Sequence, residues 1–276
     1  MNLIDCKSAR ERILDEVRAS GYENLKLVII SASDDPASKI YVKNKVKTAE
    51  SVGIEAQVID VENPTYWSVS EAIEYAARDD RVTGIILQLP LPDHLKQYER
   101  ELLDLIPYQK DVDGLSSESM GRLWSGKPCI VPATAQGVME LLPEDLSGKT
   151  VTVVNRSNLI GKPLIKLLLD RDATVNVCHS KTPYLLSEIQ EADIVIVGIG
   201  VPKYFRNYFF SPGQIWIDCG INRDPDGKIC GDVDLTDIDR EKVDVTPVPG
   251  GVGILTTAQL MANVVKAYEL QEELSV

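Results

Sequence analysis

The chain has 276 residues, of which 44% are hydrophobic and 26% are charged, and its formal net charge is −13. This length suits one large domain or two ordinary ones, and the composition is that of a soluble globular protein. The negative charge argues against nucleic acid as a partner, because phosphate binding needs a basic face. The apolar runs are too short to span a bilayer, so no membrane association is expected.

No signal peptide is expected, because the N-terminus has no basic segment followed by an apolar one. The five cysteines are scattered and include no C-x-x-C pair, which is typical of reduced thiols in a cytosolic protein. We therefore predict a cytoplasmic location and no metal site.

The first half of the chain alternates helical and strand patterns. Helices are predicted at 8–20, 39–51 and 68–78, and strands at 25–31, 54–61 and 82–88. Ser68 and Glu71 have the spacing of a capping box for the third helix. The strand at 82–88 is apolar without polar alternation, as in strands buried on both faces. Strands separated by helices predict a parallel sheet.

A second unit is predicted after the loop at 128–132. Strands are expected at 150–154, 173–178, 193–197, 214–218 and 243–246, and helices at 161–170 and 257–270. A glycine- and proline-rich loop, 246–253, precedes the last helix. The fold class is therefore α/β with two lobes, the second a Rossmann-like parallel-sheet lobe for a nucleotide.

The turn that begins at Asn155 follows a predicted strand and leads into a helix at Gly161, an arrangement that can cradle a phosphate. Gly161 alone remains of a G-x-G-x-x-G motif, and Asn155 is expected to replace the first glycine because asparagine tolerates a left-handed backbone. An ordinary turn without a ligand is the alternative.

The second strand of this lobe ends in Cys178-His179-Ser180-Lys181-Thr182, where NAD-binding folds usually carry an acidic residue for the ribose. Hydroxyl groups, a lysine and the nearby Arg156 favour NADP, with NAD as the alternative. His179 is expected to be structural, because no nucleophile or acid is placed beside it.

Tyr41 and Lys45 lie four residues apart in a predicted helix, so both side chains share one face. An aromatic ring beside an amine can hold a planar heterocycle and move a proton next to it. Gln88 follows a buried strand at its carboxyl end, where parallel sheets collect ligands, and can orient Lys45 by hydrogen bonding. A satisfied strand-end amide is the alternative for Gln88.

Asp111 and Asp113 flank one valine in a turn-forming segment. Residues two apart in an extended loop face opposite sides, so at most one of them is expected to point into a cleft. A carboxylate can hold an amino-pyrimidine edge through two parallel hydrogen bonds. Solvation at the surface is the alternative for either aspartate.

Together these segments resemble the bifunctional methylenetetrahydrofolate dehydrogenase/methenyltetrahydrofolate cyclohydrolase family. Eight motifs occur in family order over nearly the whole chain, and this combination is highly specific. The motifs are Pro36-Ala37-Ser38-x-x-Tyr41-x-x-x-Lys45, Gln88-Leu89-Pro90-Leu91-Pro92, Lys110-Asp111-Val112-Asp113-Gly114, Arg156-Ser157-x-x-Ile160-Gly161-x-Pro163, Cys178-His179-Ser180-Lys181-Thr182, Asp218-Cys219-Gly220-Ile221-Asn222, Gly231-Asp232-Val233 and Thr246-Pro247-Val248-Pro249-Gly250-Gly251-Val252-Gly253.

The resemblance implies that Lys45 is the general acid/base, that Tyr41 stacks on the pterin, that Gln88 tunes Lys45 and that Asp113 holds the pterin edge. Further folate contacts are implied for Leu89, Pro90, Gly250 and Gly251. Contacts to the dinucleotide are implied for Asn155, Arg156, Ser157, Ser180, Ile221 and Thr256.

The implied activity is oxidation of 5,10-methylenetetrahydrofolate with NADP, followed by hydrolysis to 10-formyltetrahydrofolate. These steps belong to one-carbon metabolism, which supplies purine, histidine and methionine synthesis. The implied folate lobe comprises 1–133 and 256–276, with the last helix packed back on it, and the implied nucleotide lobe comprises 134–255. Family members are typically homodimers that pair through their nucleotide lobes.

Four positions depart from the family pattern. Glycine usually stands at the position of Asn155, cysteine and proline at those of Ala133 and Ala135, and proline at that of Ile254. A dehydrogenase without cyclohydrolase activity, using NADP or NAD, is one alternative, and an assay of methenyltetrahydrofolate decay distinguishes it from the bifunctional enzyme. A noncatalytic folate- or nucleotide-binding protein is the other, but such a protein does not need Lys45 and its orienting amide.

Overall fold

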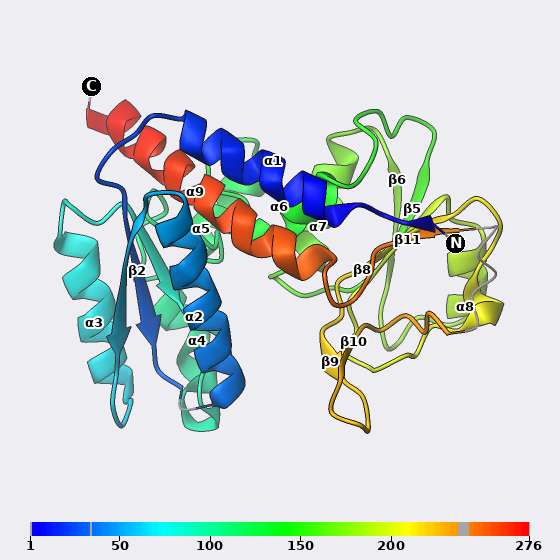
Figure 1. The fold of residues 1–276 in the computed structure, drawn as a ribbon, viewed down its shortest axis with the longest axis horizontal. Helices are drawn as coiled ribbons and strands as arrows, with labels where there is room; N and C mark the ends of the chain where they lie inside the picture. The colour runs from blue at the N-terminus through cyan, green and yellow to red at the C-terminus, as the bar shows by residue number, and fades with distance from the viewer. Residues whose placement is uncertain (1, 34, 237–242, 276) are drawn as a thin grey trace. The chain divides into compact units, whose positions relative to one another are not determined.

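A computed structural model describes residues 2–33, 35–236 and 243–275 of the chain (Figure 1). The chain divides into two compact units. The folate unit, named for its predicted ligand, comprises Arg12–Ala133 and the chain from Thr257, and the nucleotide unit comprises the N-terminal residues to Glu11 together with Thr134–Thr256.

The folate unit is built on a three-stranded parallel sheet in the order β3-β2-β4. These strands span Lys26–Ser31 (β2), Glu55–Asp60 (β3) and Gly84–Leu87 (β4). Alternate strand residues, including Val28, Ile30 and Ile85, pack against α3 (Tyr66–Arg78). The helix α2 (Pro36–Ser51) contacts β2 and β3, and Figure 1 shows it on the side of the sheet opposite α3. The predicted parallel sheet is confirmed.

Two further long helices contribute to this unit: α1 (Cys6–Ala19), which begins in the nucleotide unit, and the last helix of the chain. The remaining helices are short. They are η1 (Asp93–Tyr98), α4 (Glu99–Leu103) and α5 (Ser117–Trp124). Side-chain caps define α5: Ser116 accepts from Ser119 N, and Asp104 accepts from the backbone and hydroxyl of Ser117. With only eight residues, the helix is too short to show a clear hydrophobic period, and it was not predicted from the sequence.

The last helix, α9 (Val252–Ser275), begins five residues before the predicted start at 257. Its C-terminal part belongs to the folate unit. There Asn263 Nδ2 donates to Val112 O and Val131 O, and Gln271 Nε2 donates to Thr83 O. These contacts confirm that the C-terminal helix packs back on the first lobe.

The nucleotide unit holds a six-stranded parallel sheet in the order β1-β11-β8-β7-β5-β6. The strands span Asn2–Leu3 (β1), Thr150–Val154 (β5), Thr174–Cys178 (β6), Ile194–Val197 (β7), Ile215–Asp218 (β8) and Asp244–Val245 (β11). A short antiparallel hairpin pairs β9 (Asn222–Arg223) with β10 (Ile229–Cys230). Residues up to Glu11 join this unit, and not the folate lobe as expected, because β1 pairs with β11.

Helices cover both faces of the larger sheet. Leu164 and Leu168 of α7 (Gly161–Leu169) pack on one face with α6 (Ala133–Met139). Ile189 of α8 (Leu185–Gln190) packs on the other face, where η2 (Asn207–Phe209) also contributes. The chain leaves β5 toward β6 and returns to β7 on the opposite side of β5, so the order reverses between β5 and β7. Doubly wound sheets bind ligands at such a reversal.

The start of α3 corrects one prediction. Thr65, and not Ser68, is the N-cap: Thr65 Oγ1 accepts from Ser68 N at 3.1 Å, and Ser68 Oγ accepts from Thr65 N at 2.9 Å. Ser68 is therefore the third helical residue of the box, and the exposed Glu71 has no part in it. The helix starts earlier because Tyr66 packs on the core of the unit.

Thr65→Ala should lower the free energy of unfolding by about 1 kcal/mol, because the first turn of α3 loses its cap. Glu71→Ala, the matched control on the same helix, should change it by less than about 0.5 kcal/mol. Urea titrations followed by circular dichroism measure both. A larger loss in the Glu71 variant would restore the original assignment of the cap.

Candidate active site

Tyr41 and Lys45 lie on α2, which Asp35 caps by accepting from Ser38 N at 3.1 Å. The ring of Tyr41 is 43% exposed and Lys45 is half-buried. Lys45 Nζ donates to Gln88 Oε1 at 3.0 Å. The structure thus brings together the amine and the amide that the sequence singled out, with a solvent-facing ring one helical turn away.

Gln88 is buried directly after β4, and its amide orientation is fixed. Gln88 Nε2 donates to Leu89 O at 2.5 Å, and Gln88 N donates to Ile30 O at 2.9 Å. The amide oxygen is therefore the atom left to face Lys45. Leu89 and Pro90, joined by a cis peptide bond, continue from it, with Leu89 half-buried and Pro90 exposed.

The Asp113 loop, residues 110–114, separates the roles of its two aspartates. Asp111 is 1% exposed and accepts from Ser116 N at 2.8 Å and Ser119 Oγ at 2.7 Å. Burial raises the pKa of its carboxyl group, and these donors oppose that rise. Asp113 is half-exposed, and within the described chain no hydrogen bond reaches its carboxylate. Asp113 alone is thus free to meet a ligand, consistent with at most one of the pair entering a cleft.

A parallel bridge between Ile85 and Asp111 sets the Asp113 loop alongside β4. Asp113 lies two residues beyond its bridge position and Gln88 three residues beyond Ile85, so both follow the carboxyl edge of the sheet. β2 also runs parallel to β4 and leads into α2 at this edge. One sheet edge therefore carries all the predicted chemical groups of this unit.

Sequence reasoning missed Ser38. It is 2% exposed, and its Oγ finds no hydrogen-bond partner among the described residues. It lies on α2 three residues before Tyr41, on the same side of the helix. Its place inside the Pro36-Ala37-Ser38 motif was the available signal.

Asn155 shapes the turn after β5 through its side chain. Asn155 Oδ1 accepts from Ser157 N at 2.8 Å and from Gly161 N at 3.0 Å, and Nδ2 donates to Gly198 O at 2.5 Å. Its backbone is not left-handed, so the predicted reason for asparagine in place of glycine, tolerance of a left-handed backbone, is wrong. The amide instead ties the ends of β5 and β7 together at the reversal in strand order.

Gly161 permits this closure, because a Cβ there would lie 2.3 Å from Asn155 O. Ser157 Oγ accepts from Ile160 N at 3.1 Å, which orders the turn further. Arg156 is exposed, and no acidic side chain of the described residues pairs with it. An ordered turn with a free guanidinium suits a phosphate ligand.

The turn after β6 presents Ser180 at the surface. His179 Nδ1 accepts from Lys181 N at 3.1 Å, and His179 N donates to Thr182 Oγ1 at 2.9 Å. His179 therefore holds the turn, which agrees with its predicted structural role. No acidic residue stands between Cys178 and Thr182.

Two buried carboxylates position Ile221, which is 49% exposed. Asp218 accepts from Gly220 N at 2.8 Å and from Val233 N at 2.9 Å. Asp232 accepts from Asn222 Nδ2 at 2.8 Å. It also accepts from the three successive backbone N–H groups of residues 199–201 in the loop after β7. The two aspartates therefore fix the loops that follow β7 and β8.

Gly250, Gly251 and Thr256 also belong to the nucleotide unit. Gly250 has a left-handed backbone with φ +95°, and a Cβ on Gly251 would lie 2.1 Å from Pro247 O, so both positions require glycine. The hydroxyl of Thr256 lies 3.1 Å from Val252 O and 3.2 Å from Thr134 Oγ1. Gly250 and Gly251, predicted to bind folate, are thus in a different unit from the other folate residues.

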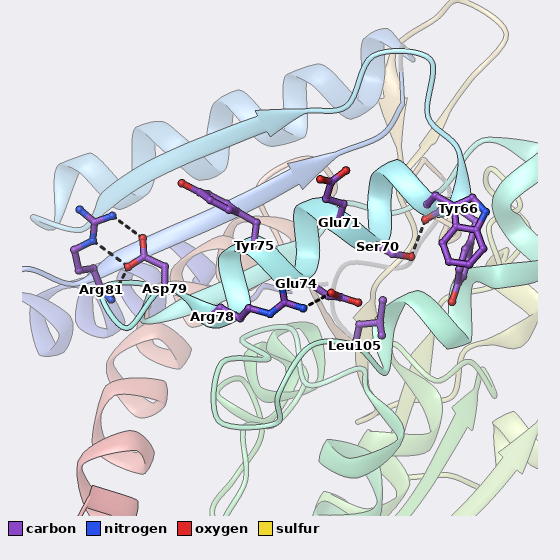
Figure 2. Close-up of a pocket in the computed structure, with 10 residues that line it drawn as sticks. Tyr66, Ser70, Glu71, Glu74, Tyr75, Arg78, Asp79, Arg81 and Leu105 are labelled. Atoms are coloured by element: carbon purple, nitrogen blue, oxygen red, sulfur yellow. Dashed lines mark hydrogen bonds and ion pairs between the residues drawn. The ribbon is translucent and has the colours of Figure 1, made fainter.

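A hollow of about 810 Å³ lies along α3 (Figure 2). Trp67 and Tyr75 at its edge are 78% and 66% exposed. Its cations are already paired, Arg78 with Glu74 and Arg81 with Asp79. None of the predicted site residues lines it. This hollow therefore contributes nothing to the site described above.

Two absences concern the described residues alone. Residues 2–33, 35–236 and 243–275 contain no cluster of three or more histidine, cysteine or acidic side chains that could hold a metal ion. In the same ranges no helix is long and apolar enough to cross a membrane. None of the five cysteines, all of which lie in these ranges, forms a disulfide bond.

The Asp218 carboxyl group should make stability depend on pH. Burial and the neighbouring Asp232 raise its pKa to about 6, against the opposing backbone donors. The folded state therefore holds this proton more tightly than the unfolded state, and stability from this group increases as pH falls through 6. Between pH 7 and pH 5 the wild type should gain about 1 kcal/mol relative to Asp218→Asn. Urea unfolding of both proteins at the two pH values tests this, and parallel changes would contradict it.

Comparisons with known proteins agree with this geometry. The model of the tetrahydrofolate dehydrogenase/cyclohydrolase catalytic domain matches residues 4–113, and that of its NAD(P)-binding domain matches residues 132–272. The bifunctional protein FolD of Agathobacter rectalis is 42% identical over 96% of this chain and 98% of its own length.

Solved structures give the same result. The bifunctional FolD enzyme of Campylobacter jejuni superimposes with a TM-score of 0.90 at 38% identity, covering 98% of this chain and 99% of its own. The Trypanosoma brucei FolD, solved with NADP cofactor and inhibitor, has a TM-score of 0.89 at 30% identity and covers 98% and 97%. The chain belongs to the tetrahydrofolate dehydrogenase/cyclohydrolase family.

Proposed function

We propose that this protein oxidises 5,10-methylenetetrahydrofolate to the methenyl form with NADP and hydrolyses that product to 10-formyltetrahydrofolate. The observation that carries this proposal is the hydrogen bond of 3.0 Å between Lys45 Nζ and Gln88 Oε1 beside the exposed ring of Tyr41. Relatives that share this chain's length carry both activities in their names, as bifunctional dehydrogenase/cyclohydrolases. Both activities are therefore assigned, in preference to a monofunctional dehydrogenase or a noncatalytic binder.

In the folate unit Tyr41 stacks on the pterin and Asp113 accepts hydrogen bonds from its amino-pyrimidine edge. Two parallel bonds to one carboxylate fix the heterocycle in its plane. Leu89 and Pro90 complete the folate contacts of this unit. Holding the ring in one orientation supplies most of what the first step needs, because hydride transfer depends chiefly on alignment.

The residues of the nucleotide unit fit NADP. The free guanidinium of Arg156 and the hydroxyl of Ser180 receive the 2′-phosphate, while Asn155, Ser157, Ile221 and Thr256 contact the rest of the dinucleotide. NADP, when bound, accepts the hydride that leaves the one-carbon bridge. The absence of a carboxylate between Cys178 and Thr182 supports NADP over NAD, because an NAD ribose would lack its usual partner.

Hydrolysis is the step that needs proton transfer. Water adds to the methenyl carbon and loses a proton to the Lys45 amine. The carbon–N5 bond then breaks as Lys45 protonates N5, and the remaining hydroxyl proton leaves to solvent as the formyl carbonyl forms. Lys45 acts as general base and then general acid, and Gln88 holds its nitrogen toward the reacting carbon. One lysine therefore serves both proton movements.

We also propose that the protein is a cytoplasmic homodimer paired through its nucleotide units, with no nucleic-acid partner. The scattered cysteines without a C-x-x-C pair support the cytoplasmic location, and the family resemblance supports the homodimer. The net charge of −13 supports the last. The proposed reactions belong to one-carbon metabolism.

Spectroscopy tests the overall function. Adding methylenetetrahydrofolate and NADP should produce reduced nicotinamide, followed by decay of methenyl absorbance faster than in buffer. Persistent methenyl absorbance would identify a monofunctional dehydrogenase. No reduced nicotinamide with either NADP or NAD would leave only a binding protein.

Lys45→Met should lower the cyclohydrolase rate by at least about 100-fold, because the amine proposed to carry the proton is lost. The KM for the folate substrate should change by less than about threefold. Lys43→Met, an exposed lysine on the same helix, is the matched control and should behave as wild type. An unchanged rate of methenyltetrahydrofolate decay in the Lys45 variant would refute its role.

Arg156→Ala should raise the KM for NADP by about 10- to 100-fold, the value of a charged hydrogen bond to the 2′-phosphate. The KM for NAD in the same variant should be unchanged, because NAD lacks that phosphate. Initial rates with each cofactor measure both values. An equal rise for the two cofactors would place Arg156 elsewhere on the dinucleotide.

A further inference from the structure

Of the three polar side chains in the Asp113 loop, those of Lys110 and Asp111 are hydrogen-bonded to the protein itself. Lys110 Nζ donates to Ala77 O and Asp79 O at the end of α3, and Lys110 O accepts from Ile85 N at 2.7 Å. Asp111 O accepts from Gly114 N at 3.0 Å. The carboxylate of Asp113 is the exception, since no described residue donates a hydrogen bond to it.

Asp111 fixes the loop from the side of α5. Its carboxylate accepts from Leu115 N at 3.3 Å, Ser116 N at 2.8 Å and Ser119 Oγ at 2.7 Å. Ser119 is fully buried, so these bonds are made away from water. A carboxylate with three buried donors holds its own backbone in one place.

Asn263 fixes the loop from the side of α9. It is 2% exposed in an otherwise apolar stretch of that helix. Asn263 Nδ2 donates to Val112 O and to Val131 O, each at 2.9 Å. One amide therefore joins the peptide that precedes Asp113 to the neighbouring segment.

Packing removes the remaining freedom of the loop. Val112 is fully buried, and a Cβ on Gly84 would lie 2.4 Å from its Cγ1. Gly114 has φ +65°, and a Cβ there would lie 2.8 Å from Ile130 O. The residues on both sides of Asp113 are thus held in place, which fixes the position from which its side chain projects.

We propose that Asn263 and Asp111 are positioning residues for the folate substrate, which act by holding the Asp113 carboxylate where it meets the amino-pyrimidine edge. This inference rests on the proposed role of Asp113. Two parallel hydrogen bonds demand placement within about 0.5 Å, and a loop free to shift would lose one of them. Neither positioning residue touches the substrate.

Asn263→Leu keeps the branching at Cγ and removes both N–H donors of the amide. The KM for methylenetetrahydrofolate should rise about 10-fold or more, while kcat changes less, because the lost contact binds ground state and transition state alike. The KM for NADP should stay within about twofold of wild type. Ser119→Ala, a milder change that removes one donor to Asp111, should show the same pattern at about threefold, and it decides the question if the Asn263 variant does not fold.

A double-mutant cycle with Asp113→Asn separates positioning from general stability. In the Asp113→Asn background, Asn263→Leu should raise the folate KM by less than about twofold, because the carboxylate it positions is already gone. Independent, multiplying effects would overturn the proposal. Gln271→Leu is the matched control: its amide also joins α9 to backbone carbonyls, and its loss should leave the folate KM unchanged.

The cycle also distinguishes this inference from the role of Asp113. If Asp113→Asn alone leaves the folate KM unchanged, the proposed function of Asp113 fails first. If Asp113→Asn raises that KM and neither Asn263→Leu nor Ser119→Ala does, only the positioning inference fails.

Discussion

The loops at the carboxyl ends of the strands in both parallel sheets are held by polar side chains that accept hydrogen bonds from the loop backbone. A buried N–H without a partner costs about 1–3 kcal/mol, so each loop that leaves a strand needs an acceptor. Asp111 supplies it in the folate unit, and Asn155, Asp218 and Asp232 supply it in the nucleotide unit. The same bonds that stabilise these loops determine where their free side chains point.

This arrangement separates two kinds of polar residue at each edge. Asp111 and Asp113 are the clearest pair, because they have the same chemistry and lie two positions apart. The carboxylate of the buried Asp111 accepts several hydrogen bonds, and the carboxylate of Asp113 accepts none from the described residues. In the nucleotide unit the engaged Asn155 and the free Arg156 form a similar neighbouring pair. Rigid support next to a free group is what precise ligand placement requires.

The structure shows what surrounds the four residues that depart from the family pattern. At the position where the family usually has glycine, Asn155 caps the turn with its side chain and ties it to Gly198. Ala133 and Ala135 are both buried in α6, where small side chains fit the packing. Ile254 is half-buried in the first turn of α9. The turn after β5 is therefore held by an asparagine side chain and is ordered by its hydrogen bonds.

The sequence by itself determined the α/β class, the parallel sheets and the chemical candidates. Alternating apolar strands and helices carry that information locally, and Tyr41 and Lys45 are linked by helical spacing alone. Only the tertiary structure decided which carboxylate of Asp111 and Asp113 is free, that Asn155 acts through its amide, and that Asn263 holds a loop far away in sequence. It also showed that the first residues of the chain belong to the nucleotide unit, because β1 pairs with β11. These outcomes depend on which backbone groups come to lie within hydrogen-bonding distance after folding, and no local pattern records that.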